Sequence, residues 1–83
     1  MKCTIYYLDY CSHCKAARQL LRQKGTPTEE IDVDRFGGKY AVIHALRDNG
    51  RLPKNTSKIT FPIVYIDAKY IGGFTELSKF LNK

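Results

Sequence analysis

Short strand-like and helix-like patterns alternate along the 83-residue chain, which leaves few possible folds. Short alternating or wholly apolar runs predict four strands, at residues 3–8, 30–34, 62–66 and 69–71. Apolar residues at three- and four-residue spacing predict three helices, at residues 11–24, 39–49 and 75–81, the last capped by Thr75. This order predicts an α/β fold (βαβαββα) in which three helices flank a mixed four-stranded sheet. The length fits a single domain spanning residues 1–83.

The composition narrows the cellular setting. No apolar run approaches the ~18–20 residues that cross a bilayer. The first nine residues alternate like a strand and include an acid, Asp9, so we do not expect a signal peptide. A secreted disulfide scaffold of this size would carry an even set of cysteines, whereas this chain has three. We therefore expect a cytoplasmic protein without membrane association, whose cysteines perform chemistry.

Two of the cysteines, Cys11 and Cys14, lie three residues apart where the first helix begins. That spacing places them on one helix face, with Cβ atoms roughly 5–6 Å apart, close enough for a disulfide. The helix start favours a thiolate at Cys11, and Cys14 lies one turn further in. The pattern predicts a redox pair, with Cys11 as nucleophile and Cys14 as resolving thiol. His13 is expected to stabilise the Cys11 thiolate and make the disulfide more oxidising, or else to be a solvated residue.

Other functions of the cysteines are disfavoured. A structural zinc site needs four ligands, and beyond the pair the chain offers only Cys3, His13 and His44. A purely structural disulfide is not expected either, because the cytoplasm keeps cysteines as thiols. Cys3, in the first strand, is expected to be a small buried apolar residue.

The formal net charge of +6 raises a nucleic-acid alternative. The 14 lysines and arginines are spread along the sequence instead of forming one basic run. We therefore expect no nucleic-acid partner. The positive field is expected to favour thiolates and to attract anionic partners.

Three motifs in this order make the chain resemble a glutaredoxin, a member of the thioredoxin-fold superfamily. They are the Cys-x-x-Cys at residues 11–14, Thr60-Phe61-Pro62 before a strand, and Gly72-Gly73 before a helix. The segments 70–77 and 50–58 look most like the small glutaredoxins of bacteriophages. The resemblance implies a thioredoxin-like fold and a monomer that reduces protein disulfides or glutathione mixed disulfides with glutathione as reductant. It also implies ribonucleotide reductase as a protein substrate.

The resemblance also assigns site residues. It implies a cis peptide bond before Pro62, placed against the cysteine pair, and a Phe61 backbone that pairs with glutathione. The N–H groups of Phe74 and Thr75 would bind the γ-glutamyl carboxylate. The implied glutathione-binding set is Tyr10, Phe61, Pro62, Gly73, Phe74 and Thr75. The candidates for the glycine carboxylate are Arg47, Lys54 and Lys58.

The motif departs from the family between its cysteines, where Ser12 and His13 replace the usual proline and tyrosine. Glutaredoxins with serine at this place include some that bridge a [2Fe–2S] cluster between two subunits with glutathione. A glutathione-assisted, cluster-binding dimer is therefore the alternative to the reductase.

Overall fold

The computed structural model describes residues 2–52 and 59–82. Its sheet has the strand order β2-β1-β3-β4, with β1 (Cys3–Tyr7) and β3 (Ile63–Ile66) in the centre. Strand β2 (Thr28–Asp32) runs parallel to β1, whereas β3 is antiparallel to both β1 and β4 (Lys69–Gly72). The predicted mixed sheet is confirmed.

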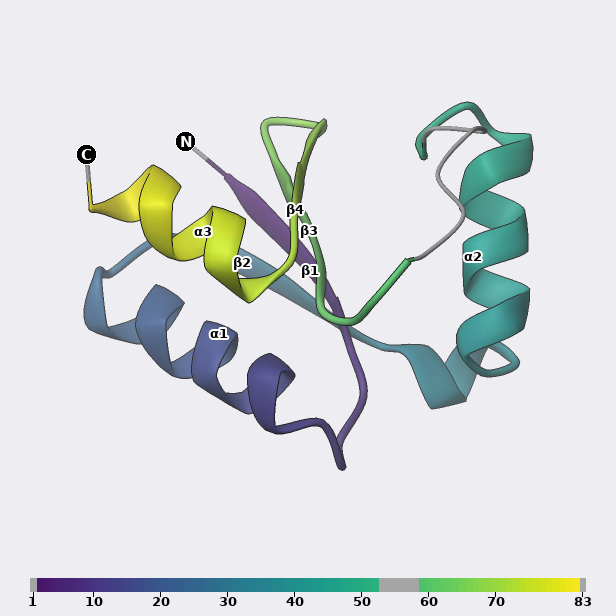
Figure 1. The fold of residues 1–83 in the computed structure, drawn as a ribbon, viewed down its shortest axis with the longest axis horizontal. Coiled ribbons are helices and arrows are strands. Elements are labelled where there is room, and N and C mark those ends of the chain that lie inside the picture. Colours follow the sequence, from purple (N-terminus) through teal and green to yellow (C-terminus); the bar gives the residue numbers. More distant parts are fainter. Residues whose placement is uncertain (1, 53–58, 83) are drawn as a thin grey trace.

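Helices cover both faces of the sheet (Figure 1). Helices α1 (Ser12–Gln23) and α3 (Phe74–Leu81) lie side by side on one face. Helix α2 (Lys39–Asp48) lies on the opposite side of the sheet. None of the helices in the described ranges is long and apolar enough to span a membrane.

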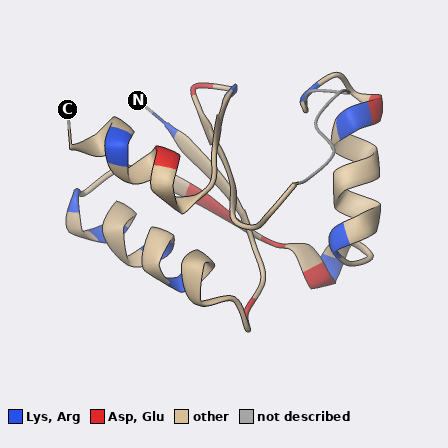
Figure 2. Ribbon diagram, viewed as in Figure 1, with Lys and Arg blue, Asp and Glu red and all other residues tan. Residues whose placement is uncertain are grey.

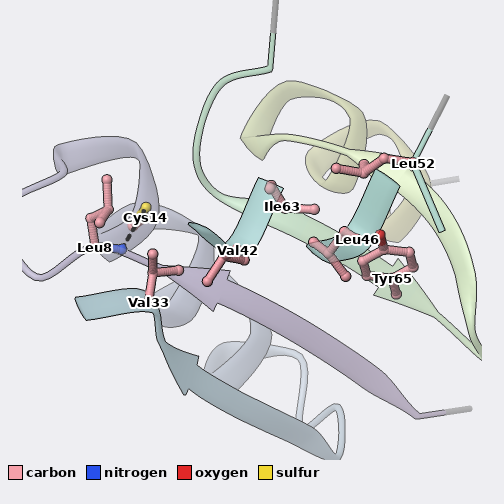
Figure 3. Close-up of a cluster of buried hydrophobic side chains, with 8 residues drawn as sticks. All are labelled: Leu8, Cys14, Val33, Val42, Leu46, Leu52, Ile63 and Tyr65. Carbon is pink, nitrogen blue, oxygen red and sulfur yellow. Dashed lines mark hydrogen bonds between the residues drawn. The ribbon is translucent and has the colours of Figure 1, made fainter. Parts of the chain in front are cut away.

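The alternation of side chains along the central strands produces two separate cores. Ile5, Val64 and Ile66 point toward α1 and α3 and pack with Leu21 and Leu77. The alternate β3 positions point the other way, and the cluster on that side is drawn in Figure 3. Its buried members are Leu8, Cys14, Val33, Val42, Leu46, Leu52, Ile63 and Tyr65. All four residues of β3 are buried because the strand carries both cores.

The predicted second strand was placed two residues too late. The strand ends at Asp32, and the chain continues as a 3-10 helix, η1 (Val33–Phe36). The Asp32 carboxylate accepts a hydrogen bond from the Asp34 N–H at 3.1 Å, which starts this turn. Val33 then enters the core next to α2, so its apolar character reflects packing in a turn and not a strand.

The predicted cap of the last helix was also wrong. The N-cap of α3 is Gly73, and Thr75 lies exposed in the first turn. The Glu76 carboxylate accepts the Gly73 N–H at 2.8 Å, which is the half of a capping box that the third helical residue makes back to the N-cap.

Candidate active site

Cys11 is the N-cap residue of α1, at the end of the short connection from β1. Its backbone is extended, with φ −98° and ψ 118°, and its sulfur accepts the Cys14 N–H at 3.4 Å. No acidic residue lies in the first turn of the helix. The N–H donor and the positive end of the helix dipole both stabilise negative charge on this half-exposed sulfur.

Cys14 has a different environment. It is fully buried among apolar side chains, and its sulfur accepts the Leu8 N–H at 3.4 Å (Figure 3). Burial raises the pKa of this thiol to about 12, although the hydrogen bond from Leu8 opposes the shift. Cys14 is therefore a neutral thiol at physiological pH, one helical turn from a sulfur that is suited to carry charge.

The Phe61–Pro62 segment lies against the first cysteine. Its peptide bond is cis, as the resemblance implied. The Cys11 thiol points at the Phe61 carbonyl oxygen, 3.6 Å away, and Pro62 is buried. Residues 50 positions apart in the sequence thus meet at the reactive sulfur.

A hollow of about 300 Å³ opens between the start of α1, the segment before Pro62 and the start of α3. Its lining comprises His13, Thr60, Phe61, Gly73, Phe74, Thr75 and Glu76. Most of the predicted glutathione-binding residues therefore come together at one place. Tyr10 does not line this hollow, because its 75% exposed side chain lies beside Cys11 in a shallower depression with Asp9 and Lys15.

The His13 ring packs toward Phe74 across this hollow, with ring centroids 6.5 Å apart. Within the described residues the imidazole makes no hydrogen bond to the Cys11 sulfur. Its predicted influence on the thiolate would therefore act through space and not through a direct contact.

Sequence analysis did not assign Glu76 to the site. Besides accepting the Gly73 N–H, its side chain folds over Gly72. A Cβ atom at Gly72 would come within 2.7 Å of the Glu76 Cγ, and Gly72 has a φ of +130° that favours glycine. The spacing of three residues from Gly73 to Glu76 is that of a capping box, and it was the available sequence signal.

Of the candidates for binding the glycine carboxylate, Arg47 does not line this hollow. Arg47 lies near the end of α2, and the part of the hollow formed by described residues has no lysine or arginine. Lys54 and Lys58 lie outside the described residues. Figure 2 shows the basic residues distributed over α1, α2 and α3.

Metal binding by this chain alone has no support in the described residues, where no three His, Cys, Asp or Glu side chains group as a metal site would require. A shared cluster would need further ligands from glutathione and a second chain. Cys11 is the partly exposed cysteine, whereas Cys3 and Cys14 are buried.

The chain matches known proteins along almost its whole length. Residues 3–71 match the glutaredoxin family model. Over 73 residues the chain is 30% identical to glutaredoxin 3 of Escherichia coli, covering 88% of this chain and 77% of that one. The crystal structure of glutaredoxin 1 from Francisella tularensis, 30% identical, aligns with a TM-score of 0.67 over 99% of this chain and 98% of that one. The glutaredoxin-like NrdH-redoxin of E. coli, described as having a thioredoxin-like activity profile, is 26% identical and aligns with a TM-score of 0.68 over 99% and 92% of the two chains.

Proposed function

The chain belongs to the glutaredoxin family of thiol–disulfide oxidoreductases with a thioredoxin-like fold, and we propose that it is a glutathione-dependent member acting through Cys11 and Cys14. The observation that carries this assignment is the contrast between the two sulfurs. One is half-exposed at a helix start with a hydrogen-bond donor, and the other is buried with a pKa raised to about 12. Such a pair assigns attack to Cys11 and resolution to Cys14.

The reaction begins when the Cys11 thiolate attacks a substrate disulfide. One substrate sulfur leaves as a thiolate, and the other forms a mixed disulfide with Cys11. In the dithiol branch Cys14 attacks the Cys11 sulfur and releases the second substrate thiol. In the monothiol branch the mixed disulfide is with glutathione, and a second glutathione attacks it. Reduced glutathione regenerates the dithiol form in both branches.

The hollow beside Cys11 supports glutathione as the reductant. The N–H groups of Phe74 and Thr75 lie in the first turn of α3, where a helix leaves its N–H groups without intrahelical acceptors. They can donate to the γ-glutamyl carboxylate. The Phe61 backbone faces the cysteine and can pair with the extended tripeptide. Tyr10, 75% exposed beside Cys11, lies outside this hollow and is proposed to contact glutathione from there.

The proposed setting is the cytoplasm, where a reduced glutathione pool is available. The proposed active form is a monomer, and the proposed protein substrate is ribonucleotide reductase. This substrate can be tested directly by measuring electron transfer from the reduced protein to oxidised ribonucleotide reductase.

The decisive assay is glutathione-dependent reduction of a small glutathione mixed disulfide, compared with reduction of a protein disulfide. Cys11→Ser should abolish both activities, whereas Cys14→Ser should retain the first and lose the second. Equal loss from both substitutions would contradict the monothiol branch.

A second comparison separates glutathione use from a thioredoxin-like activity profile of the kind described for NrdH-redoxin. Reduced glutathione and thioredoxin reductase are each supplied as the sole reductant of the oxidised protein. Faster reduction by thioredoxin reductase would contradict glutathione dependence.

Anaerobic purification with glutathione tests the cluster alternative, since a brown dimer would support it.

A further inference from the structure

Arg18 follows Cys14 by one helical turn on α1, which places the two side chains on the same side of the helix. Two contacts hold its guanidinium group. The Cζ atom lies 4.0 Å from the centroid of the Tyr7 ring, and Nε donates to Glu30 Oε1 at 2.7 Å. The side chain is only 25% exposed. The charge is therefore fixed between the helix and the sheet, where water screens it less than at the surface.

The Arg18 guanidinium packs beside the chain segment whose backbone donates a hydrogen bond to the Cys14 sulfur. Tyr7, which packs on Arg18, directly precedes Leu8, whose N–H donates to the Cys14 sulfur. Burial raises the pKa of Cys14 most, the Leu8 N–H lowers it and the neighbouring Cys11 raises it; the positive charge of Arg18 also lowers it, as the smallest of these effects.

The groups that act on Arg18 itself are all negative or neutral. Burial alone would lower the pKa of Arg18, but Glu30 on β2, Tyr7 on β1 and Asp9 in the following connection favour the charged guanidinium, and together they raise its pKa. Arg18 therefore stays charged throughout the pH range in which the thiols react.

We propose that Arg18 is a positioning residue for the second half of the reaction, where its fixed charge stabilises the thiolate that Cys14 must become. The inference rests on the proposed function, because it needs Cys14 to resolve a mixed disulfide on Cys11. Arg18 serves the dithiol branch and is not needed for the first attack by Cys11.

The Cys14 thiol releases its proton to solvent, and its sulfur attacks the Cys11 sulfur of the mixed disulfide. The Cys11–Cys14 bond forms, the bond from Cys11 to the substrate sulfur breaks, and the substrate thiolate takes up a proton. The cysteine pair is oxidised by two electrons and the substrate is reduced by two. In the reverse direction Cys14 is the leaving thiolate.

The expected effect is on rates and not on the equilibrium. Cys14 is protonated in the reduced protein with or without Arg18, so the reduction potential should stay the same at neutral pH. For each pKa unit added to Cys14, the thiolate population falls tenfold. The remaining thiolate is more nucleophilic, so the net loss of rate is about threefold per unit.

The experiment uses the reduced full-length protein and the aromatic disulfide 5,5′-dithiobis(2-nitrobenzoate), which releases a coloured thiolate at each step. The first release reports attack by Cys11 and the second reports resolution by Cys14, a phase that Cys14→Ser should remove. Arg18→Gln and Arg18→Met remove the charge, and Arg18→Lys keeps it. Arg22→Gln is the matched control, because Arg22 also reaches Glu30, at 3.4 Å, but is 63% exposed one turn further along.

We expect Arg18→Gln and Arg18→Met to slow the second release across pH 7–9, by about threefold for each unit that the pKa of Cys14 rises, and to leave the first release unchanged. Arg18→Lys should recover most of the rate, and Arg22→Gln should match the unsubstituted protein. The proposal is overturned if the second release keeps its rate without the charge, if lysine is as slow as glutamine, or if both releases slow equally. Absence of any first release in the unsubstituted protein would instead contradict the proposed function itself.

Discussion

Raising the pH from 7 to 10 should destabilise the folded protein through its two buried thiols. Burial raises the pKa of Cys3 from its ordinary 9.0 to about 11, and that of Cys14 to about 12. Both thiols have no exposed surface in the fold. A group whose pKa is raised by folding contributes stability that is complete below the unfolded pKa. That contribution is lost as the pH rises, here from 9 toward 11 for Cys3 and toward 12 for Cys14.

The magnitude follows from the size of these shifts. At pH 10 each thiol is mostly ionised in the unfolded chain and still protonated in the folded one. One pKa unit corresponds to about 1.4 kcal/mol, so each thiol should lower the free energy of unfolding by about 1–2 kcal/mol and the two together by about 3 kcal/mol.

The measurement is urea unfolding followed by circular dichroism at pH 7 and pH 10, with a phosphine reductant that keeps the thiols reduced. Cys3→Ala isolates one thiol, because alanine is small, apolar and does not titrate. The fall in the free energy of unfolding of Cys3→Ala between the two pH values should be smaller than that of the unsubstituted protein by about 1–2 kcal/mol. An equal drop in the two proteins would refute the assignment of the pH dependence to buried thiols.

Three further predictions concern the hollow beside Cys11. Gly72→Ala should lower the free energy of unfolding by about 1–3 kcal/mol, because Gly72 has a positive φ and an added Cβ would meet Glu76. Gly73→Ala should lower it clearly less. Equal losses in urea unfolding would contradict the role of Gly72. Glu76→Gln should destabilise α3 by about 0.5–1 kcal/mol, since the Gly73 N–H loses a charged acceptor, and an unchanged melting temperature would argue against that contact. His13→Tyr should give a lower reduction potential in equilibrium with glutathione, and an unchanged or higher value would show that the imidazole does not tune the thiolate.

The sequence predicted those parts of the fold that follow from local pattern. The helix after Cys11 was predictable because its apolar spacing and its start both lie in one short segment. Strand β3 was predictable because a strand buried on both faces is apolar at every position. The end of β2 was not predictable, because Val33 is apolar in order to pack against α2, and local alternation cannot distinguish such a residue from one in a strand.

For the candidate site, the cysteine pair could be identified from spacing alone, but the convergence of its surroundings could not. The contact between Cys11 and Phe61 depends on how the sheet is assembled. The cap of α3 was missed because a glycine N-cap has no side chain and the acceptor comes from Glu76, inside the helix. The place of Arg18 likewise depends on strand pairing, since Glu30 lies on another element.

The central position of β1 has a consequence for how the protein is made. β1 leaves the ribosome before the other strands of this sheet, yet one of its two neighbours is β3, more than 50 residues later. Until β3 has been synthesised, the apolar cluster around Cys14 lacks the side chains of Ile63 and Tyr65. The Cys14 thiol, fully buried in the finished protein, is therefore accessible to solvent and oxidants for most of its synthesis. Its burial is complete only when the second half of the chain has joined the sheet.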